Sequence, residues 1–451
     1  MKVLHRLISL TCLCMLVLAA CGPAATTVAP TEAPAPTTAV EPTEEAPAPT
    51  TAPNKVKITW WHITTDDKGK AYWQSVADAY MADHPNVAIE ITVMDNEQFK
   101  QKLATVMQSG EPPDLFQSWG GGVMNAYAEG GLLKDITSDI EGEWKDSFAP
   151  GPLAVYSYNG KQYGVPWDMG MVGFWYNKAL FAQAGIDAPP QTWSELLDAV
   201  KKLKAAGIIP IALGGKDKWP GHFWWVYLAV RLGGQPAFDA AYSRSGSFAD
   251  ETFVKAGEKL KELIDLEPFE DGFLGLGYND QAALMGNGKA ALELMGQWAP
   301  GAQAGNAEDK IGIGEDLGFF PFPKVEGGVG EASDAMGGGN GIAVGKNAAP
   351  EAVDFLRYLT TSDHQRAMAE QGLAVPVVKG AEDGIKDPLL KEVQATLGKA
   401  KYFQLYYDQY LPPAVGDAVK DATEGLFAGT LSPEEAAQMI EDSASTELSS
   451  N

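Results

Sequence analysis

Residues 56–119 decide the fold, and they read VKITWWHITTDDKGKAYWQSVADAYMADHPNVAIEITVMDNEQFKQKLATVMQSGEPPDLFQSW. The apolar spacing in this stretch switches between the two-residue period of a strand and the period of a helix face. Strands and helices are therefore expected in turn at Val56–Ile63, Lys70–Ala82, Val87–Met94, Phe99–Met107 and Leu115–Trp119. Elements that alternate in this way predict an α/β fold, with a mostly parallel sheet covered by helices.

Similar signals recur further along the chain. Capping boxes at Thr192-Trp-Ser-Glu195 and Ser432-Pro-Glu-Glu435 predict helix starts. A long helix is expected from about Pro350 to Glu370, after Gly-rich stretches at 327–330 and 337–341. Because the globular part exceeds one typical core, we expect two domains. The Gly-rich stretches are candidate crossings between them, although glycine clusters also occur in ordinary loops.

The first residues are typical of an export signal. A basic start precedes an apolar run at 7–18, which is too short to stay in a membrane as a spanning helix. The run ends in Leu18-Ala-Ala-Cys21, which resembles a bacterial lipobox. We therefore expect residues 1–20 to be a signal peptide and Cys21 to carry a lipid. The alternative is a plain signal peptide that is cut before an incidental cysteine.

Residues 21–54 have the composition of a tether. They consist largely of Pro, Ala, Thr and Glu, with almost nothing apolar to bury. A segment of this kind is expected to hold the globular part within reach of a membrane. A surface spacer without any membrane partner would have the same composition.

Cysteine usage and charge exclude several functions. Cys12, Cys14 and Cys21 lie at or before the expected cleavage site, so the globular part has no thiol for a disulfide, for catalysis or for a metal. Without Lys2 and Arg6, 32 basic residues remain against 59 acidic ones, a formal charge of −27. This charge argues against nucleic acid and anionic lipid as partners. The remaining histidines are scattered, so neither a metal nor another cofactor is expected.

Several short motifs together resemble a known family. In order, they are Ile58-Thr-Trp-Trp-His62, Glu111-Pro-Pro-Asp-Leu-Phe116, Tyr163-Gly-Val-Pro166, Trp175-Tyr-Asn-Lys178 continuing to Gly185, Thr192-Trp193 and Met295-Gly-Gln-Trp298. Their order and spacing resemble the family 1 extracellular solute-binding proteins of ABC transporters, the group that includes maltodextrin-binding protein. The resemblance covers essentially the whole globular part.

The resemblance implies a type II-like periplasmic-binding-protein fold, in which two α/β lobes joined by a hinge close on a ligand. Crossovers are then expected near Trp167-Asp168, near 322–328 and near 374–376. The implied boundaries are 55–167 with 327–374 for the N-terminal lobe, and 168–326 with 375–451 for the C-terminal lobe.

A sugar is the expected ligand. Sugars have apolar C–H faces and polar hydroxyl edges, so a site for them needs aromatic planes together with carboxylates, amides and indole N–H groups. Residues that follow the strands of the first lobe should face the cleft, because they lie at the carboxyl ends of those strands. The candidates there are Thr65, Asp66, Gln117, Ser118 and Trp119. Asp114, at the start of its strand, is expected to be structural.

Further candidates follow from the resemblance. Trp298 matches a sugar-stacking position, and the segment 219–225 supplies contacts from the second lobe. The crossover after Pro166 and the late Tyr-rich segment add to these, and the candidates are Trp167, Asp168, Trp219, His222, Trp224, Trp298, Tyr406 and Asp408. Gly339 and Asn340 are candidates for another reason: the glycines at 337–341 would let backbone approach a ligand closely, and the Asn340 amide both donates and accepts. Any of the aromatic residues could instead belong to the core. The family's late tryptophan is absent from 402–410, where tyrosines stand.

The function expected from the sequence is that of an extracytoplasmic, lipid-anchored and monomeric protein. It would bind a di- or oligosaccharide and deliver it to the membrane permease of an ABC importer. A two-lobed protein for a peptide or polyamine is an alternative, and a secreted glycoside hydrolase is a further one. We expect no enzyme, because the chain has neither a Gly-x-Ser-x-Gly elbow nor a His-Glu-x-x-His helix.

Overall fold

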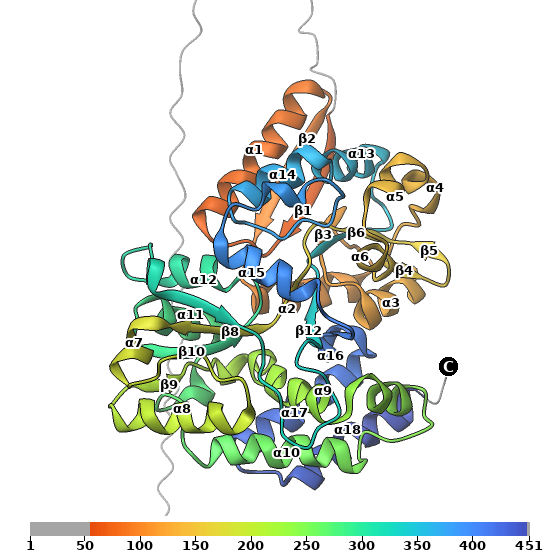
Figure 1. Ribbon diagram of the computed structural model, residues 1–451. Helices are drawn as coiled ribbons and strands as arrows, with labels where there is room; N and C mark the ends of the chain where they lie inside the picture. The colour runs from red at the N-terminus through yellow and green to blue at the C-terminus, as the bar shows by residue number, and fades with distance from the viewer. Residues whose placement is uncertain (1–54, 449–451) are drawn as a thin grey trace, which may run out of the picture. The chain divides into compact units, whose positions relative to one another are not determined.

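The computed structural model describes residues 55–448, which form two lobes with separate β-sheets (Figure 1). The expected signal peptide, Cys21 and the tether at 21–54 lie outside these residues. Within 55–448, no helix combines the length and the apolar character that a membrane span requires.

A five-stranded sheet with the order β2-β1-β3-β13-β6 forms the centre of the first lobe. Its strands are β1 (Val56–His62), β2 (Val87–Val93), β3 (Leu115–Ser118), β6 (Gly164–Pro166) and β13 (Gly341–Val344). β1 pairs in parallel with β2 and β3, which confirms the arrangement predicted from residues 56–119. β13 runs antiparallel to β3 and β6. The Asp114 carboxylate accepts hydrogen bonds from the backbone and side chain of Thr59 at 2.8 and 2.7 Å, so its role is structural.

Helices and a short hairpin surround this sheet. They are α1 (Asp67–Asp83), α2 (Asn96–Ser109), α3 (Gly121–Glu129), α4 (Thr137–Ile140), α5 (Glu143–Ser147), α6 (Pro150–Ala154), β4 (Ser157–Tyr158), β5 (Lys161–Gln162), α13 (Pro350–Leu359) and α14 (Ser362–Glu370). The single helix predicted from 350 to 370 is wrong. Thr361 has an extended backbone and its side chain caps a new helix by accepting from the His364 N–H, so the chain forms α13 and α14.

The second lobe contains two smaller sheets. The four-stranded sheet has the order β11-β8-β10-β9, and the three-stranded sheet has the order β14-β12-β7. Their strands are β7 (Gly170–Met171), β8 (Gly173–Asn177), β9 (Ile209–Ile211), β10 (Ala290–Met295), β11 (Leu317–Phe320), β12 (Ala335–Gly338) and β14 (Phe403–Leu405). β8 lies antiparallel to β10 and β11, and β9 lies parallel to β10.

Ten helices of different lengths belong to the described part of this lobe, and several pack on these sheets (Figure 1). They are α7 (Lys178–Gln183), α8 (Trp193–Ala205), α9 (Trp219–Tyr242), α10 (Glu251–Ile264), α11 (Tyr278–Gly286), α12 (Ala299–Asn306), α15 (Pro388–Leu397), α16 (Tyr407–Tyr410), α17 (Pro413–Phe427) and α18 (Pro433–Glu447). Four short 3-10 turns are η1 (Gly215–Asp217), η2 (Phe273–Gly275), η3 (Gly314–Asp316) and η4 (Glu382–Gly384). Both predicted capping boxes are confirmed, at the starts of α8 and α18.

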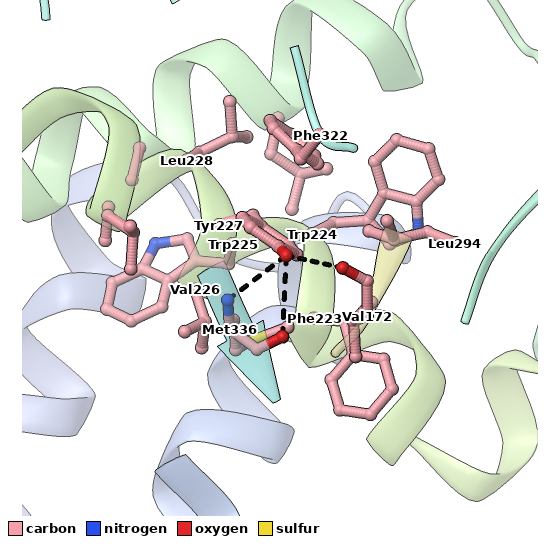
Figure 2. Close-up of a cluster of buried hydrophobic side chains, with 14 of the residues drawn as sticks. Val172, Phe223, Trp224, Trp225, Val226, Tyr227, Leu228, Leu294, Phe322 and Met336 are labelled. Carbon is pink, nitrogen blue, oxygen red and sulfur yellow. Dashed lines mark hydrogen bonds between the residues drawn. The ribbon is translucent and has the colours of Figure 1, made fainter. Parts of the chain in front are cut away.

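Helix α9 forms the centre of the second hydrophobic core. Trp224 and Trp225 are fully buried in it (Figure 2). The Tyr227 hydroxyl donates to the Val172 carbonyl and accepts from the Met336 N–H at 3.1 Å, so α9 is fixed to the strands beside it. Neighbouring aromatic residues on different faces of one helix are therefore all buried in the same core.

The chain returns to the first lobe later than the sequence predicted. It leaves the five-stranded sheet after Pro166 and rejoins it at Gly341, immediately after β12. Residues 327–338 therefore belong with the second lobe, and the expected crossover near 322–328 is not one. The cause is Arg231, a fully buried residue of α9 around which this segment folds.

Arg231 satisfies the backbone of that segment with its guanidinium group. It donates to the carbonyls of Phe322, Pro323, Ala332 and Asp334 at 2.7, 3.1, 3.3 and 2.7 Å. Buried carbonyls need partners, and a charged donor strengthens each hydrogen bond. The loop between β11 and β12 is thereby held on α9.

The last crossing also lies later than predicted, between η4 and α15 rather than near 374–376. Val377 and Val378 are buried in the core of the first lobe. The Lys379 N–H donates to the Ser147 carbonyl at 2.8 Å. These contacts keep the chain on the first lobe, so the final second-lobe segment begins near Pro388 instead of at residue 375.

The lobes also touch directly where α3 meets α16. A Cβ atom on Gly122 would lie 2.2 Å from the carbonyl oxygen of Leu411, and one on Gly121 would lie 2.7 Å from that of Gln409. Gly121 has a φ of +64°, which favours glycine. Only residues without side chains allow the two backbones to approach so closely.

Replacing Arg231 by methionine should leave three buried carbonyls, those of Phe322, Pro323 and Asp334, without their donor. We expect the free energy of unfolding to fall by about 3 kcal/mol or more, because unsatisfied buried acceptors are costly. Urea denaturation followed by Trp fluorescence would measure this change. Arg366→Met, at a partly exposed arginine, is the matched control and should cost less than about 1 kcal/mol. A loss at Arg231 no larger than at Arg366 would contradict the role given to the guanidinium group.

Candidate functional site

A cavity of about 610 Å³ lies between the two lobes. The first lobe contributes the residues that follow β1, β2 and β3, and the second lobe contributes the starts of α9, α11, α12 and α16. Carboxyl ends of strands and amino ends of helices therefore meet around one space. A junction of this kind, with a volume of 300–1,000 Å³, is typical of ligand sites.

The two lobes approach each other at this cavity. The Lys100 ammonium, on α2, lies 5.6 Å from the ring of Trp119 in its own lobe and 5.9 Å from the ring of Trp219 in the other. At another edge, a Cβ atom on Gly305 would lie 3.5 Å from the Cβ of Asp66. Contacts from both lobes therefore border the cavity.

Aromatic rings form much of the second-lobe wall. Trp219 packs against Tyr278 with ring centroids 4.8 Å apart, and against Trp298 at 6.4 Å. Tyr406 continues this cluster, 6.4 Å from Trp298. Trp119 lines the cavity from the first lobe. The cavity thus offers flat apolar surfaces on both sides.

Polar atoms without protein partners lie among these rings. Within the described residues, Trp219 Nε1, Gln297 Oε1 and Tyr406 Oη are buried and have no hydrogen-bond partner. All three residues are at least nine-tenths buried, and all three line the cavity. Because buried polar atoms are nearly always satisfied, these three indicate where a ligand would supply the missing bonds.

Asp168 lies at the first crossover and connects segments of both lobes. Its Oδ2 accepts from the side-chain amides of Asn340 and Gln297 at 2.9 and 2.6 Å, and its Oδ1 accepts from the Val375 N–H at 3.0 Å. Asn340 in turn accepts from Gln117 at 2.9 Å. Asp168 lines the cavity, but its two oxygens are largely used in holding these protein segments together. Burial raises its pKa to about 6, although these hydrogen bonds oppose the shift.

His222 lies behind the cavity wall and orders two residues that form it. A carbonyl can only accept, so the 2.7 Å contact with the Trp219 carbonyl places a proton on His222 Nδ1. His222 Nε2 is 3.5 Å from Asp408 Oδ1. Burial lowers the pKa of the His222 ring. His222 thus supports Trp219 and Asp408 from the core.

Ten of the residues predicted from the sequence line the cavity. They are Thr65, Asp66, Trp119, Trp167, Asp168, Trp219, Trp298, Asn340, Tyr406 and Asp408. Asp66 also caps α1, because its Oδ1 accepts from the Gly69 N–H at 2.7 Å. The strand-end argument and the resemblance therefore both located this cavity.

Three other candidates face away from it. His222 and Trp224 are fully buried in the second lobe, where Trp224 packs on Phe174 at 5.3 Å. On a helix, Trp219 and Phe223 are four residues apart and share the cavity face, so the next residue turns into the core. Gly339 also does not line the cavity: a Cβ atom there would lie 2.4 Å from the Asp168 carbonyl, so close protein packing explains this glycine.

Gln117 and Ser118 end β3 but do not reach the cavity. Gln117 is buried and orients Asn340, and the Ser118 hydroxyl accepts from the Gly120 N–H at 3.1 Å. Both predictions of cavity contact were wrong because these side chains are used to hold the neighbouring turn and crossover. Trp119, one residue further on, is the first of the three to line it.

The prediction missed several lining residues, most clearly Asn96, Glu97 and Lys100 on α2. They follow β2 in the same way as Asp66 follows β1, so the strand-end rule could have found them. Tyr278 and Gln297 were also missed. Tyr278 follows a loop with little pattern of its own, whereas Gln297 stands beside Trp298 in a motif that had been recognised.

Glu293, on β10, is buried behind this wall. The side-chain amides of Gln281 on α11 and Gln303 on α12 donate to it at 2.9 and 2.6 Å. Burial raises its pKa to about 7, although both amides oppose the shift. One carboxylate therefore holds together two helices whose first turns border the cavity. Among the described residues, no group of three or more His, Cys, Asp and Glu side chains is placed to hold a metal ion.

A cavity enclosed by two α/β lobes, with three crossovers beside it, defines a two-lobed ligand-binding protein. Residues 64–366 match the family model of bacterial extracellular solute-binding proteins, and the chain belongs to that family.

Individual relatives agree with this assignment. An uncharacterised ABC transporter extracellular-binding protein of Pyrococcus horikoshii is 27% identical over 247 residues, 54% of this chain and 55% of that protein. A probable sugar-binding periplasmic protein of Mesorhizobium japonicum is 28% identical over 338 residues, 73% of this chain and 78% of that protein. A solved chitin oligosaccharide binding protein has a TM-score of 0.80 and 27% identity, and covers 88% of this chain and 100% of its own. The two-lobed α/β fold is confirmed.

Asp168→Asn should weaken the junction of the crossovers, because an amide group would point N–H donors at groups that themselves donate. We expect the free energy of unfolding to fall by about 2–4 kcal/mol. Denaturant titration at pH 7.5 would measure it. Asp271→Asn, at an exposed loop position, is the control and should be close to neutral. A neutral Asp168→Asn would show that the junction does not need the carboxylate.

Glu293 should make stability depend on pH. Between about pH 4.5 and 7, the folded protein keeps a proton on Glu293 that the unfolded chain releases, so stability falls as pH rises through this window. Glu293→Gln should remove this contribution. Its stability relative to wild type should therefore improve by up to about 3 kcal/mol between pH 4.5 and 8. Exposed Glu258→Gln is the control, and an equal pH profile for both variants would count against the assignment.

Proposed function

We propose that this protein binds a di- or oligosaccharide in the inter-lobe cavity and delivers it to the permease of an ABC importer. The observation that carries the proposal is the lining of the cavity, where aromatic rings on both sides surround buried polar atoms without protein partners. Sugars present apolar faces and hydroxyl edges in the same arrangement. The sugar-binding relative and the chitin oligosaccharide binding protein support the same ligand class.

We assign binding roles to the ten predicted residues that line the cavity. Trp119, Trp219, Trp298 and Tyr406 would stack on sugar rings. The buried atoms of Trp219, Gln297 and Tyr406 would bond to hydroxyl groups. Ligand contacts to both lobes at once would favour the closed arrangement, and the permease would recognise that form. The permease partner is supported by the ABC transporter relative.

The start of the chain supports an extracytoplasmic, membrane-anchored location. We infer that the apolar run at 7–18 directs export and that Cys21 receives a lipid. Residues 21–54 would then tether a monomeric binding protein beside the permease. Palmitate labelling of the full chain in a bacterial host, with Cys21→Ser as the comparison, tests the anchor.

A polyamine or peptide ligand fits the cavity less well. Carboxylates line it, but Asp66, Asp95 and Asp387 are used as helix caps. Aromatic walls suit a neutral amphipathic ligand better than a chain of cations. A hydrolase is not proposed, because the family to which the chain belongs is one of solute-binding proteins.

Trp298→Ala should abolish most saccharide binding. We expect the Kd of the tightest-binding sugar to rise at least tenfold, or by about 1.4 kcal/mol, because a stacking plane is lost. Calorimetry with neutral mono-, di- and trisaccharides of glucose, xylose, galactose and N-acetylglucosamine would measure it on residues 55–451.

Trp61→Ala is the matched control, since Trp61 lies outside the cavity beside Lys102. Its Kd should match that of the wild type. If no saccharide binds while spermidine or a tripeptide does, the sugar assignment is wrong. If a sugar binds and Trp298→Ala leaves its Kd unchanged, the assigned stacking site is wrong.

A further inference from the structure

The cavity is lined by charged side chains as well as by aromatic rings. Resting on the proposed saccharide function, we infer that it selects uncharged saccharides and rejects those bearing carboxylate or phosphate groups, and that Glu97 contributes to this selection through Lys100. The inference concerns the ligand's charge, which neither the aromatic rings nor the fold determines.

The cavity lining is strongly acidic. It contains eight carboxylates and two lysines, a formal charge of −6. An anionic group entering this space would meet like charges in a partly desolvated cleft, where repulsion is stronger than in water. Arginine is the side chain best suited to bind carboxylate or phosphate, and none is present among the lining residues of the described chain.

Helix starts around the cavity would ordinarily attract anions. The N-termini of α1, α2, α11 and α15 all border it, and free N–H groups at a helix start bind carboxylate or phosphate. Each of these four starts carries its own carboxylate, whereas the starts of α9, α12 and α16, which also border the cavity, have no side-chain cap. The capping residues are Asp66, Asp95, Asp217, Asp280 and Asp387, whose oxygens accept backbone hydrogen bonds at 2.7–2.9 Å.

The capping carboxylates have two effects. They occupy N–H groups that an anionic ligand would need, and they cancel the partial positive charge of the helix ends. They also receive hydrogen bonds from the protein itself. They therefore need no cationic ligand, which leaves an uncharged ligand as the best fit.

Lys100 does not reverse this pattern. Lys100 Nζ is 3.4 Å from Glu97 Oε1, and it stands between the rings of Trp119 and Trp219 at 5.6 and 5.9 Å. Glu97 therefore neutralises the cation that is placed nearest to both stacking surfaces. Without Glu97, Lys100 would be free to attract an anionic substituent of a bound sugar.

The unpartnered polar atoms also favour hydroxyl groups. Trp219 Nε1 can only donate, Gln297 Oε1 can only accept, and Tyr406 Oη can do both. A sugar hydroxyl both donates and accepts, so it can satisfy each of them. A carboxylate only accepts, and against Gln297 Oε1 it would place two acceptors together. These buried atoms point to the same ligand class as the charges, but independently of them.

The test compares matched pairs of saccharides. Di- and trisaccharides of glucose, galactose and mannose are titrated beside the corresponding glucuronic, galacturonic and mannuronic acid oligomers, by calorimetry at pH 7.5 in 20 and 300 mM NaCl. We expect the acid to bind at least tenfold more weakly than its neutral counterpart at low salt, and the difference to narrow at high salt.

Glu97→Gln should reduce the discrimination. We expect the ratio of acid to neutral Kd to fall about threefold or more, because the lining loses one negative charge and Lys100 is released. Glu143→Gln is the matched control: it makes the same change of net charge at an exposed position of the first lobe, outside the cavity, and should leave the ratio unchanged.

Each outcome decides a separate point. A uronic acid oligomer that binds as tightly as its neutral counterpart overturns the inference and leaves the saccharide function standing. If neutral and acidic saccharides both fail to bind, the proposed function is wrong, and this inference with it. Equal ratios in Glu97→Gln, Glu143→Gln and wild type would overturn the part assigned to Glu97 alone.

Discussion

The buried carboxylate of Asp168 is the interaction on which the rest of the structure depends. It follows the first crossover and receives hydrogen bonds from Asn340 at the second crossover, from Gln297 of the second lobe and from Val375 of the first. A buried charge without partners would be very costly, so these donors must stay together while the lobes move. Asp168 lines the cavity, so the walls from both lobes are attached to the same residue.

The chemistry of the cavity follows from the way α/β lobes are built. Strand ends and helix starts meet at one edge, so the site is surrounded by N–H groups and by the residues that cap them. Aspartate is a favoured cap, and here it also sets the sign of the local field. A residue chosen to begin a helix can therefore determine which ligands the cleft admits. The same aspartate side chains therefore stabilise the helices and influence which ligands bind.

The sequence predicted the strands and helices better than it predicted which side chains point into the cavity. The alternation in 56–119 and the two capping boxes identified strands, helices and helix starts, because local spacing encodes them. Strand ends and family motifs located the cavity and ten of the residues that line it. They failed at Trp224 and Gly339, whose directions depend on packing partners distant in the chain. The crossovers near residues 327 and 375 were misplaced for the same reason, because Arg231 and Val377 hold those segments through tertiary contacts.

The glycine contact between α3 and α16 has a mechanical consequence. Figure 1 shows α1 and α12 to the left of α3 and α16. If the second lobe turns about Gly121 and Gly122, a small rotation there becomes a larger displacement where Asp66 faces Gly305. Leverage then grows with distance from the pivot. A ligand that reaches the edge of the cavity farthest from Gly121 would exert more torque on the lobes than one bound only near Tyr406. The degree of lobe closure would then depend on the length of the ligand.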